Sequence, residues 1–199
     1  MTNNFDHIAP AYDILSKAVF GGAILTSQLT FLDRLAQNDA VLIVGGGTGE
    51  LISYLPPVSR VDFVEKSARM LKRARKRRTQ NAIRFFERDF FEFEPTTKYD
   101  AILCPFFLDC FDQEGLGKVL GLIQRYLKSA GHLFVQDFDS DTLPPVINRL
   151  LHLFFRLTVR LEASTLLNIQ ENIFAHNFSL LEQKEMHQKM IFTSVYRNP

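Results

Sequence analysis

Short apolar runs alternate with amphipathic stretches along most of this chain. Runs rich in Val, Ile, Leu and Phe predict strands at 40–45, 60–65, 82–86, 99–104 and 131–137. Apolar residues at helical spacing predict helices at 22–37, 49–55, 67–79 and 113–129. Alternation of apolar and polar residues over 179–196 predicts two further strands.

Strands that alternate with helices indicate βαβ units, a parallel sheet and helices on both faces. Right-handed crossovers make such a sheet doubly wound, and the final strands are expected to pair antiparallel. The sequence therefore predicts an α/β fold in one domain, residues 1–199, with a mostly parallel, Rossmann-like sheet of seven strands. Ligands of such sheets bind beyond the carboxyl ends of the strands, so residues just after each strand are the candidates for a site.

The first predicted strand runs directly into four glycines, Gly45, Gly46, Gly47 and Gly49. Glycine is costly to order, so this cluster indicates a sharp turn and a close approach to the backbone. A strand, a glycine loop and a helix in succession suit a nucleotide-like cofactor. The dinucleotide motif G-x-G-x-x-G is not met, because Glu50 stands where its third glycine belongs. This argues against NAD.

Residues 41–49 resemble the first motif of the class I S-adenosylmethionine-dependent methyltransferases, and later landmarks follow in that family's order. By this resemblance, Glu65 accepts hydrogen bonds from the ribose hydroxyls of the cofactor, and Asp89 with Phe90 lies at its adenine. The cofactor-binding residues that the resemblance implies are Tyr12, Gly45, Gly46, Gly47, Gly49, Glu65, Lys66, Asp89, Phe90 and Cys104. One departure is Ile43, which replaces the family's usual acidic residue.

Two segments are expected to close over the site. The stretch FDHIAPAYD is similar to the N-terminal segment of the methyltransferases related to ubiquinone and menaquinone biosynthesis, which implies a lid over residues 1–21. Residues 143–176 are expected to form a helical insertion on the substrate side. Its helix is apolar around most of its circumference, with a stripe of basic residues, which leaves open a core and pocket role, a dimer contact or contact with a membrane surface. Phe106, Phe107 and Phe155 are the expected acceptor-lining residues.

Amino-acid composition and net charge indicate which class of molecule the protein binds. The chain has a hydrophobic content of 46%, 19 Phe and a formal net charge of +1. This favours an apolar acceptor pocket over a surface dedicated to nucleic acid. The basic run at 72–78 is interpreted as a solvated helix face. The two cysteines lack the spacing of metal ligands, so no bound metal is expected. No apolar run is long enough to span a membrane, and a cytoplasmic protein is expected, as a monomer or homodimer.

These features predict methyl transfer from S-adenosylmethionine to a small or medium apolar acceptor by in-line displacement, with S-adenosylhomocysteine as product. Asp109 and Asp137 are candidate catalytic residues by position alone, since each follows a predicted strand, and Asp112 is interpreted as a helix N-cap. Ile43 keeps an alternative open, a non-catalytic methyltransferase-fold scaffold. A further alternative is an aminopropyltransferase that uses decarboxylated S-adenosylmethionine.

Overall fold

A computed structural model gives the positions of residues 20–139, 142 and 167–199. The expected lid at 1–21 lies outside these residues apart from its last two positions. Most of the expected insertion at 143–176 lies outside them as well. The description below concerns the remaining part of the chain.

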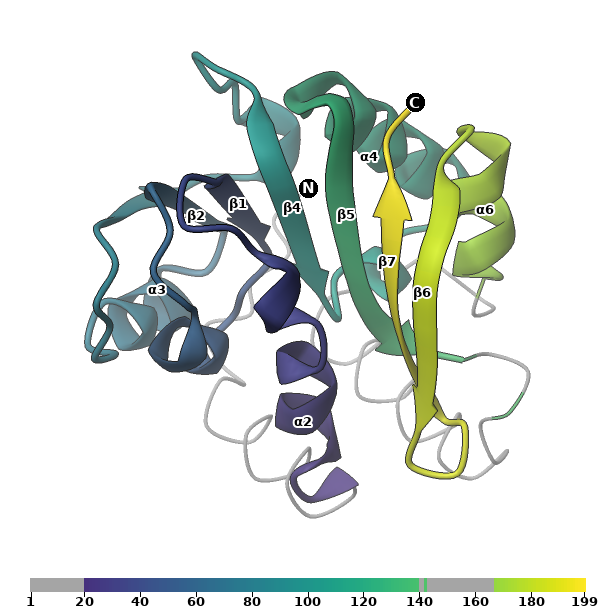
Figure 1. The fold of residues 1–199 in the computed structure, drawn as a ribbon, viewed down its shortest axis with the longest axis horizontal. Helices are drawn as coiled ribbons and strands as arrows, with labels where there is room; N and C mark the ends of the chain where they lie inside the picture. The colour runs from purple at the N-terminus through teal and green to yellow at the C-terminus, as the bar shows by residue number, and fades with distance from the viewer. Residues whose placement is uncertain (1–19, 140–141, 143–166) are drawn as a thin grey trace.

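The centre of the molecule is a seven-stranded sheet with the order β3-β2-β1-β4-β5-β7-β6 (Figure 1). Strands β1 to β5 pair in parallel, whereas β7 is antiparallel to both β5 and β6. The strands are β1 Ala40–Val44, β2 Arg60–Glu65, β3 Ile83–Glu87, β4 Tyr99–Pro105, β5 Leu127–Phe138, β6 Ser179–Met186 and β7 Ile191–Arg197. This confirms the predicted fold class.

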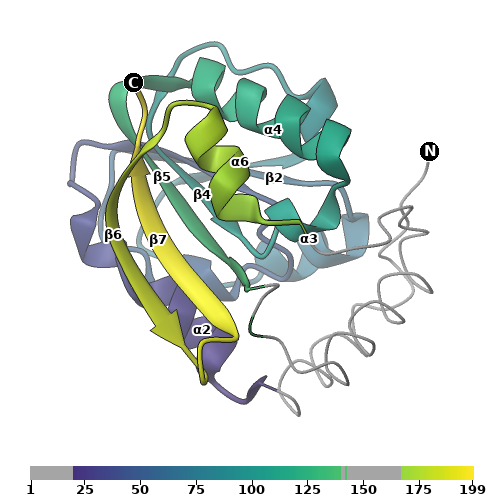
Figure 2. The same ribbon diagram turned by 90° about the vertical axis from the view of Figure 1, so that its right-hand side faces the viewer.

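Helices cover both faces of the sheet. The α-helices are α2 Ala23–Leu29, α3 Ala68–Ala74, α4 Gln113–Tyr126 and α6 Ile169–Ala175. Short 3₁₀ turns occur at Leu32–Arg34, Glu50–Tyr54, Phe90–Glu92 and Leu108–Cys110. Helices α4 and α6 pack together on one face, and α2 lies on the other (Figure 2). Helix α3 joins α2 on that second face, as the composition of the two core clusters shows.

The alternation of side chains along β1 divides the core between the two faces. Leu42 and Val44 contribute to the cluster under α4 and α6, while Val41 and Ile43 contribute to the cluster under α2 and α3. All four side chains are fully buried. A parallel strand with both faces covered favours apolar residues at successive positions, which explains the uninterrupted run of β1 in the sequence.

The predicted helix at 22–37 is wrong in its second half. Helix α2 ends at Leu29, and the Thr30 hydroxyl donates to the carbonyl of Thr26 at 2.9 Å. Phe31 then leaves helical geometry with φ −121°, and only a 3₁₀ turn follows. The predicted helix at 49–55 likewise forms as a 3₁₀ turn, because Gly49 enters it in the left-handed conformation. Apolar spacing alone does not distinguish these turns from an α-helix.

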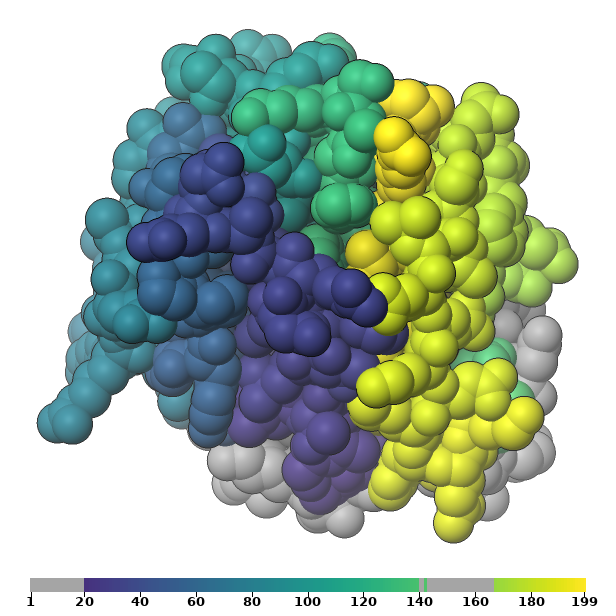
Figure 3. Space-filling model, viewed as in Figure 1, coloured from purple at the N-terminus to yellow at the C-terminus, as the bar shows by residue number. Residues whose placement is uncertain are grey.

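The segment after α2 packs against the C-terminal hairpin. Figure 3 shows these purple and yellow parts of the chain meeting on one face of the molecule. Arg34 forms an ion pair with Glu182, and the Lys184 ammonium lies 5.7 Å from the centre of the Phe31 ring. The N-terminal and C-terminal parts of the described chain therefore stabilise each other.

A buried acidic side chain on β2, Asp62, connects neighbouring strands of the sheet. Asp62 on β2 is 1% exposed, and its carboxylate accepts two hydrogen bonds from Arg84 on β3, at 2.7 and 2.6 Å. The Tyr99 hydroxyl on β4 donates to the same carboxylate at 2.7 Å. Burial, together with this bond to Asp62, raises the pKa of Tyr99. The carboxylate thus links three strands through a bidentate pair and a hydroxyl.

Replacing Asp62 with Asn should destabilise the fold, because the guanidinium of Arg84 and the hydroxyl of Tyr99 lose their charged acceptor. We expect Asp62→Asn to lower the free energy of unfolding by about 2 to 3 kcal/mol, measured by urea denaturation. The control is Glu185→Gln, which removes an exposed ion pair with Lys189 and should leave the unfolding midpoint unchanged. Equal effects of the two substitutions would contradict this role of Asp62.

Candidate functional site

The carboxyl ends of β1, β2, β4 and β5 meet at one edge of the sheet. Strands β1 and β2 end in register, with Val44 opposite Val64, and the N–H of Gly45 continues the ladder to the carbonyl of Val64 at 2.9 Å. Strands β4 and β5 end side by side, with Pro105 opposite Gln136. The glycine loop, residues 45–49, therefore lies beside the loop that follows β4.

Gly45 is required by a neighbouring side chain. Its φ of +63° lies in the left-handed region, and a Cβ built on it would fall within the ring of Phe107. A Cβ built on Gly46 would likewise overlap the ring of Phe63. At Gly49, with φ +70°, a Cβ would lie 2.7 Å from the Cβ of Ala74 on α3. These three glycines let the loop pack against its own protein.

Gly47 differs from the other three. Its φ is +58°, and the nearest atom to a Cβ built there is the Met70 sulfur at 3.8 Å. The Gly47 N–H donates to Oε2 of Glu65 at 3.0 Å. Among the glycines of the loop, Gly47 is therefore the one whose Cβ direction is unobstructed by protein.

Glu65 ties the glycine loop to the start of α3. It ends β2, is 6% exposed, and its Oε1 accepts the N–H of Ser67 at 2.8 Å while Oε2 accepts that of Gly47. The Ser67 hydroxyl in turn caps α3 by accepting the Met70 N–H at 3.2 Å. The two oxygens of Glu65 thus connect the glycine loop with the first turn of α3.

The predicted residues Lys66 and Asp89 lie together. The Lys66 ammonium is 2.6 Å from Oδ2 of Asp89, which joins the ends of β2 and β3. Oδ1 of Asp89 accepts the N–H of Phe91 at 3.1 Å and so caps the 3₁₀ turn that follows. Phe90, in that turn, is buried and meets the Phe107 ring edge-to-face at 5.9 Å.

The segment from Phe106 to Asp112, here called the β4–α4 loop, starts with a strained residue. Phe106 has φ +52°, which costs about 1 kcal/mol for a residue other than glycine. Its N–H donates to the carbonyl of Gln136 at 2.7 Å, and its ring lies 5.0 Å from that of Phe138. Asp112 caps α4 by accepting the Gly115 N–H at 2.8 Å, as predicted.

Two buried carboxyl groups lie between this loop and β5. Asp137 is fully buried; its Oδ1 accepts the Phe138 N–H at 2.9 Å and its Oδ2 accepts the Asp109 N–H at 3.2 Å. Oδ2 of Asp109 is buried without a hydrogen-bond partner. Burial raises the pKa of both carboxyls, and the charge of Asp109 raises that of Asp137 further. The two candidate catalytic residues are therefore in contact with each other and titrate as a pair.

Cys104, another predicted site residue, is fully buried in the core cluster under α4 and α6. Burial raises the pKa of its thiol, so this cysteine is protonated and unreactive at neutral pH. Tyr12 and Phe155, the remaining predicted site residues, lie outside the described residues. Ser67 was missed as a contributor to the loop, although a serine between a strand end and a helix is a recognisable N-cap signal.

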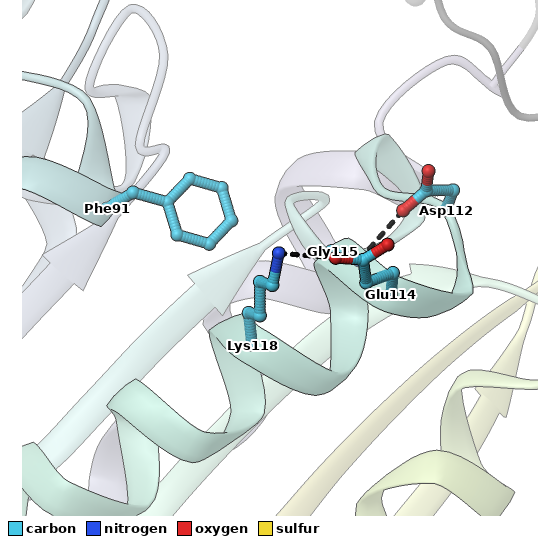
Figure 4. Close-up of a pocket in the computed structure, with 5 residues that line it drawn as sticks. All are labelled: Phe91, Asp112, Glu114, Gly115 and Lys118. Carbon is cyan, nitrogen blue, oxygen red and sulfur yellow. Dashed lines mark hydrogen bonds and ion pairs between the residues drawn. The ribbon is translucent and has the colours of Figure 1, made fainter.

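An open hollow of about 420 Å³ lies at the start of α4 (Figure 4). Its lining residues are Phe91, Asp112, Glu114, Gly115 and Lys118. The Glu114 carboxylate pairs with the Lys118 ammonium at 2.5 Å, and Asp112 holds the N–H of Gly115. The charged groups of the hollow thus already have partners, and none of the predicted site residues lines it.

Two classes of site find no support in the described part of the chain. No group of three or more His, Cys, Asp or Glu side chains there is arranged to hold a metal ion. Within the same residues, no helix combines the length and apolar character needed to cross a membrane.

Comparison with known proteins gives a domain and a fold. Residues 41–131 match the family model described as a methyltransferase domain. No curated protein matches the chain. Among solved structures, the chain resembles the N-methyltransferase NodS of Bradyrhizobium japonicum WM9 in complex with S-adenosyl-L-homocysteine, with 16% identity, 88% of this chain and 86% of that chain covered, and a TM-score of 0.67.

Two further structures give the same fold. One belongs to the complex of the Haloferax volcanii Trm112 methyltransferase activator with a methyltransferase; it has 14% identity, covers 100% of this chain and 99% of its own, and has a TM-score of 0.74. The other is an S-adenosylmethionine-dependent methyltransferase of Mesorhizobium loti, with 15% identity, coverage of 88% and 98%, and a TM-score of 0.67. At these identities the likeness is one of fold.

The packing at Gly45 leads to a testable prediction. We expect Gly45→Ala to destabilise the protein by about 1 to 3 kcal/mol, because a methyl group strains the left-handed backbone and overlaps the Phe107 ring. Phe107→Ala in the same chain should restore part of that loss by removing the overlap. Thermal and urea unfolding of the single and double variants measures both effects.

Gly121→Ala provides the control, since nothing lies within 4 Å of a Cβ at this position in α4. It should stabilise the helix by about 1 kcal/mol through helix propensity. If Phe107→Ala left the effect of Gly45→Ala unchanged, the ring would not be the reason for glycine at position 45.

Proposed function

We propose that this chain is a class I methyltransferase, which takes its methyl group from S-adenosylmethionine and transfers it to a small acceptor with a substantial apolar part; its match to a methyltransferase domain at residues 41–131 and its fold support this. The observation that carries the proposal is the arrangement at the ends of β1 and β2. There the unobstructed Gly47 and the buried carboxylate of Glu65 adjoin each other.

The residues present fit the cofactor. Glu65, whose carboxylate the N–H groups of Gly47 and Ser67 orient at the end of β2, is the group that we propose accepts the ribose hydroxyls. We propose that Asp89 and Phe90, which follow β3, contact the adenine; the ion pair with Lys66 orients the Asp89 carboxylate for this role. The glycine loop gives the close backbone approach that such a ligand needs.

Bound S-adenosylmethionine supplies a methyl group already activated on a sulfonium, so the reaction requires in-line displacement rather than activation by the protein. The chain's own residues then have to align the acceptor and exclude water. The absence of a metal site from the described residues is compatible with this chemistry. Proton removal matters only where the acceptor atom carries a proton that must leave.

Asp109 and Asp137 differ in what they can offer. Both oxygens of Asp137 accept backbone N–H groups, whereas Asp109 has one buried oxygen without a partner. A catalytic role for either one stays a prediction. The contacts support a different role, in which the pair holds the β4–α4 loop.

An apolar cluster supports the class of acceptor. Phe20, Phe138, Met190 and Ile191 form a separate core cluster at the carboxyl end of β5, and Phe106 packs against it. The rings of Phe106 and Phe138 lie 5.0 Å apart, next to the loop that follows β4. Because these four side chains are buried, we propose that the partly buried ring of Phe106 provides the apolar contact for the acceptor.

Calorimetric titration with S-adenosylmethionine and with S-adenosylhomocysteine tests the cofactor site. We expect binding by the wild-type protein and a loss of affinity of at least about tenfold in Glu65→Gln, because a neutral amide replaces one acceptor oxygen with a donor. The matched control is Glu87→Gln, which changes the exposed residue opposite Glu65 on β3 and should leave the affinity unchanged.

Two outcomes would decide against the proposal. Folded wild-type protein that binds neither molecule would remove the cofactor. Binding without methyl transfer to any acceptor in a screen of apolar amines, phenols and alcohols would favour a non-catalytic binding protein. The fold of each variant is checked by its thermal unfolding midpoint, because Glu65 also holds Gly47 and Ser67.

A further inference from the structure

The β4–α4 loop is fastened to β5 at two points. The N–H of Phe106 donates to the carbonyl of Gln136 at 2.7 Å, and the N–H of Asp109 donates to the carboxylate of Asp137 at 3.2 Å. The other oxygen of Asp137 accepts the N–H of Phe138, its neighbour on the strand. Asp137 therefore links the end of β5 to the 3₁₀ turn Leu108–Cys110 through hydrogen bonds.

This fastening determines where the Phe107 ring lies. Phe106 is held in the left-handed region, a conformation that persists only where surrounding contacts enforce it. The Phe107 ring then packs on Gly45, 5.0 Å from the ring of Phe111 and 5.9 Å from that of Phe90. A loosened loop would release this ring from the glycine loop.

The fastening is also expected to depend on the protonation of Asp109 and Asp137. Asp109 and Asp137 are neighbouring carboxyl groups, and two carboxylates in contact away from water cannot both be ionised without a large cost. The titratable groups that act on the pair are the thiols of Cys104 and Cys110, whose pKa values burial raises, and Glu65 acts on Cys110. Within the described residues, no ion pair or hydrogen bond joins either carboxyl to a basic side chain.

We propose that Asp137 is a positioning residue for the cofactor site: by accepting the N–H of Asp109, in a way that depends on pH, it holds the β4–α4 loop so that Phe107 stays packed on Gly45. The geometry of the loop carries this inference. Its relevance to catalysis rests on the proposed function, because Gly45 belongs to the proposed cofactor site.

The direction of the pH dependence follows from the raised pKa of the pair. Between the ordinary pKa of a carboxyl, about 4, and the raised value, the fastened loop binds more protons than the released loop. Fastening is therefore strongest at low pH and weakens as the pH rises through this window. If release costs one proton, its equilibrium constant changes about tenfold for each pH unit.

Hydrogen exchange of the protein alone tests the proposal. The amides of Phe106, Asp109 and Cys110 are hydrogen-bonded in the fastened loop, and their protection factors are compared at pH 5 and pH 8. In the wild type we expect protection to fall as the pH rises. In Asp109→Asn this fall should be smaller, because the variant removes the Asp109 charge that adds to burial in raising the pKa of Asp137.

Asp137→Asn should reduce the protection of the Asp109 and Cys110 amides at both pH values, because one of its two acceptor oxygens is lost. The matched control is Asp112→Asn, a change in the same loop at an exposed helix cap, where Asn caps as well as Asp. It should retain the wild-type pH dependence. Amides of β1 in the same samples report whether each variant is folded.

Two results would overturn the proposal. One is a pH dependence in Asp109→Asn equal to that of the wild type, and the other is unchanged protection in folded Asp137→Asn. If Asp137→Asn fails to fold, the comparison of Asp109→Asn with the wild type still tests the proposal. A calorimetric titration with S-adenosylhomocysteine separates the two proposals. If the protein shows the expected exchange pattern but does not bind this molecule, the proposed function is removed and this inference remains intact.

Discussion

The close packing of the glycine loop is the constraint on which the rest of the site depends. Gly45, Gly46 and Gly49 lack side chains because Phe107, Phe63 and Ala74 occupy the space that a Cβ would need. These three neighbours come from the loop after β4, from β2 and from α3, so the loop is the point where three parts of the sheet's edge converge. Beside this packing, Glu65 accepts the N–H groups of Gly47 and Ser67 and so connects the loop with α3.

The same edge of the sheet has a polar region and an aromatic region. Toward β2 and β3 it is polar, with Glu65, Lys66 and Asp89 engaged with backbone amides or with each other. Toward β5 it is aromatic, with Phe106 packed on Phe138. A nucleoside with an amino acid chain suits the first region and an apolar acceptor suits the second, which is the division that methyl transfer between two such ligands requires.

Much of this could be predicted from the sequence because two of its patterns are local. Apolar runs gave the strands, with β2 at its predicted bounds, and glycines after a strand gave the loop. What could not be predicted depends on register. Asp62 and Arg84 lie opposite each other on β2 and β3, and the contact of Asp109 with Asp137 requires the end of β4 to lie beside the end of β5. The early end of α2 depends on a local hydrogen bond of Thr30 that competes with helix geometry.

Ile43 shows how a departure from the family's motif is accommodated. The resemblance places an acidic residue at this position, yet here the side chain is fully buried in an apolar cluster with Phe63 and Leu71. An aspartate there would bury a charge among groups that offer it no partner. The isoleucine thus matches its surroundings, and its Cγ2 also lies 2.9 Å from where a Cβ of Gly46 would stand. Among the described residues, the proposed site would therefore order the amino acid end of the cofactor through the backbone of the glycine loop rather than through a carboxylate at position 43.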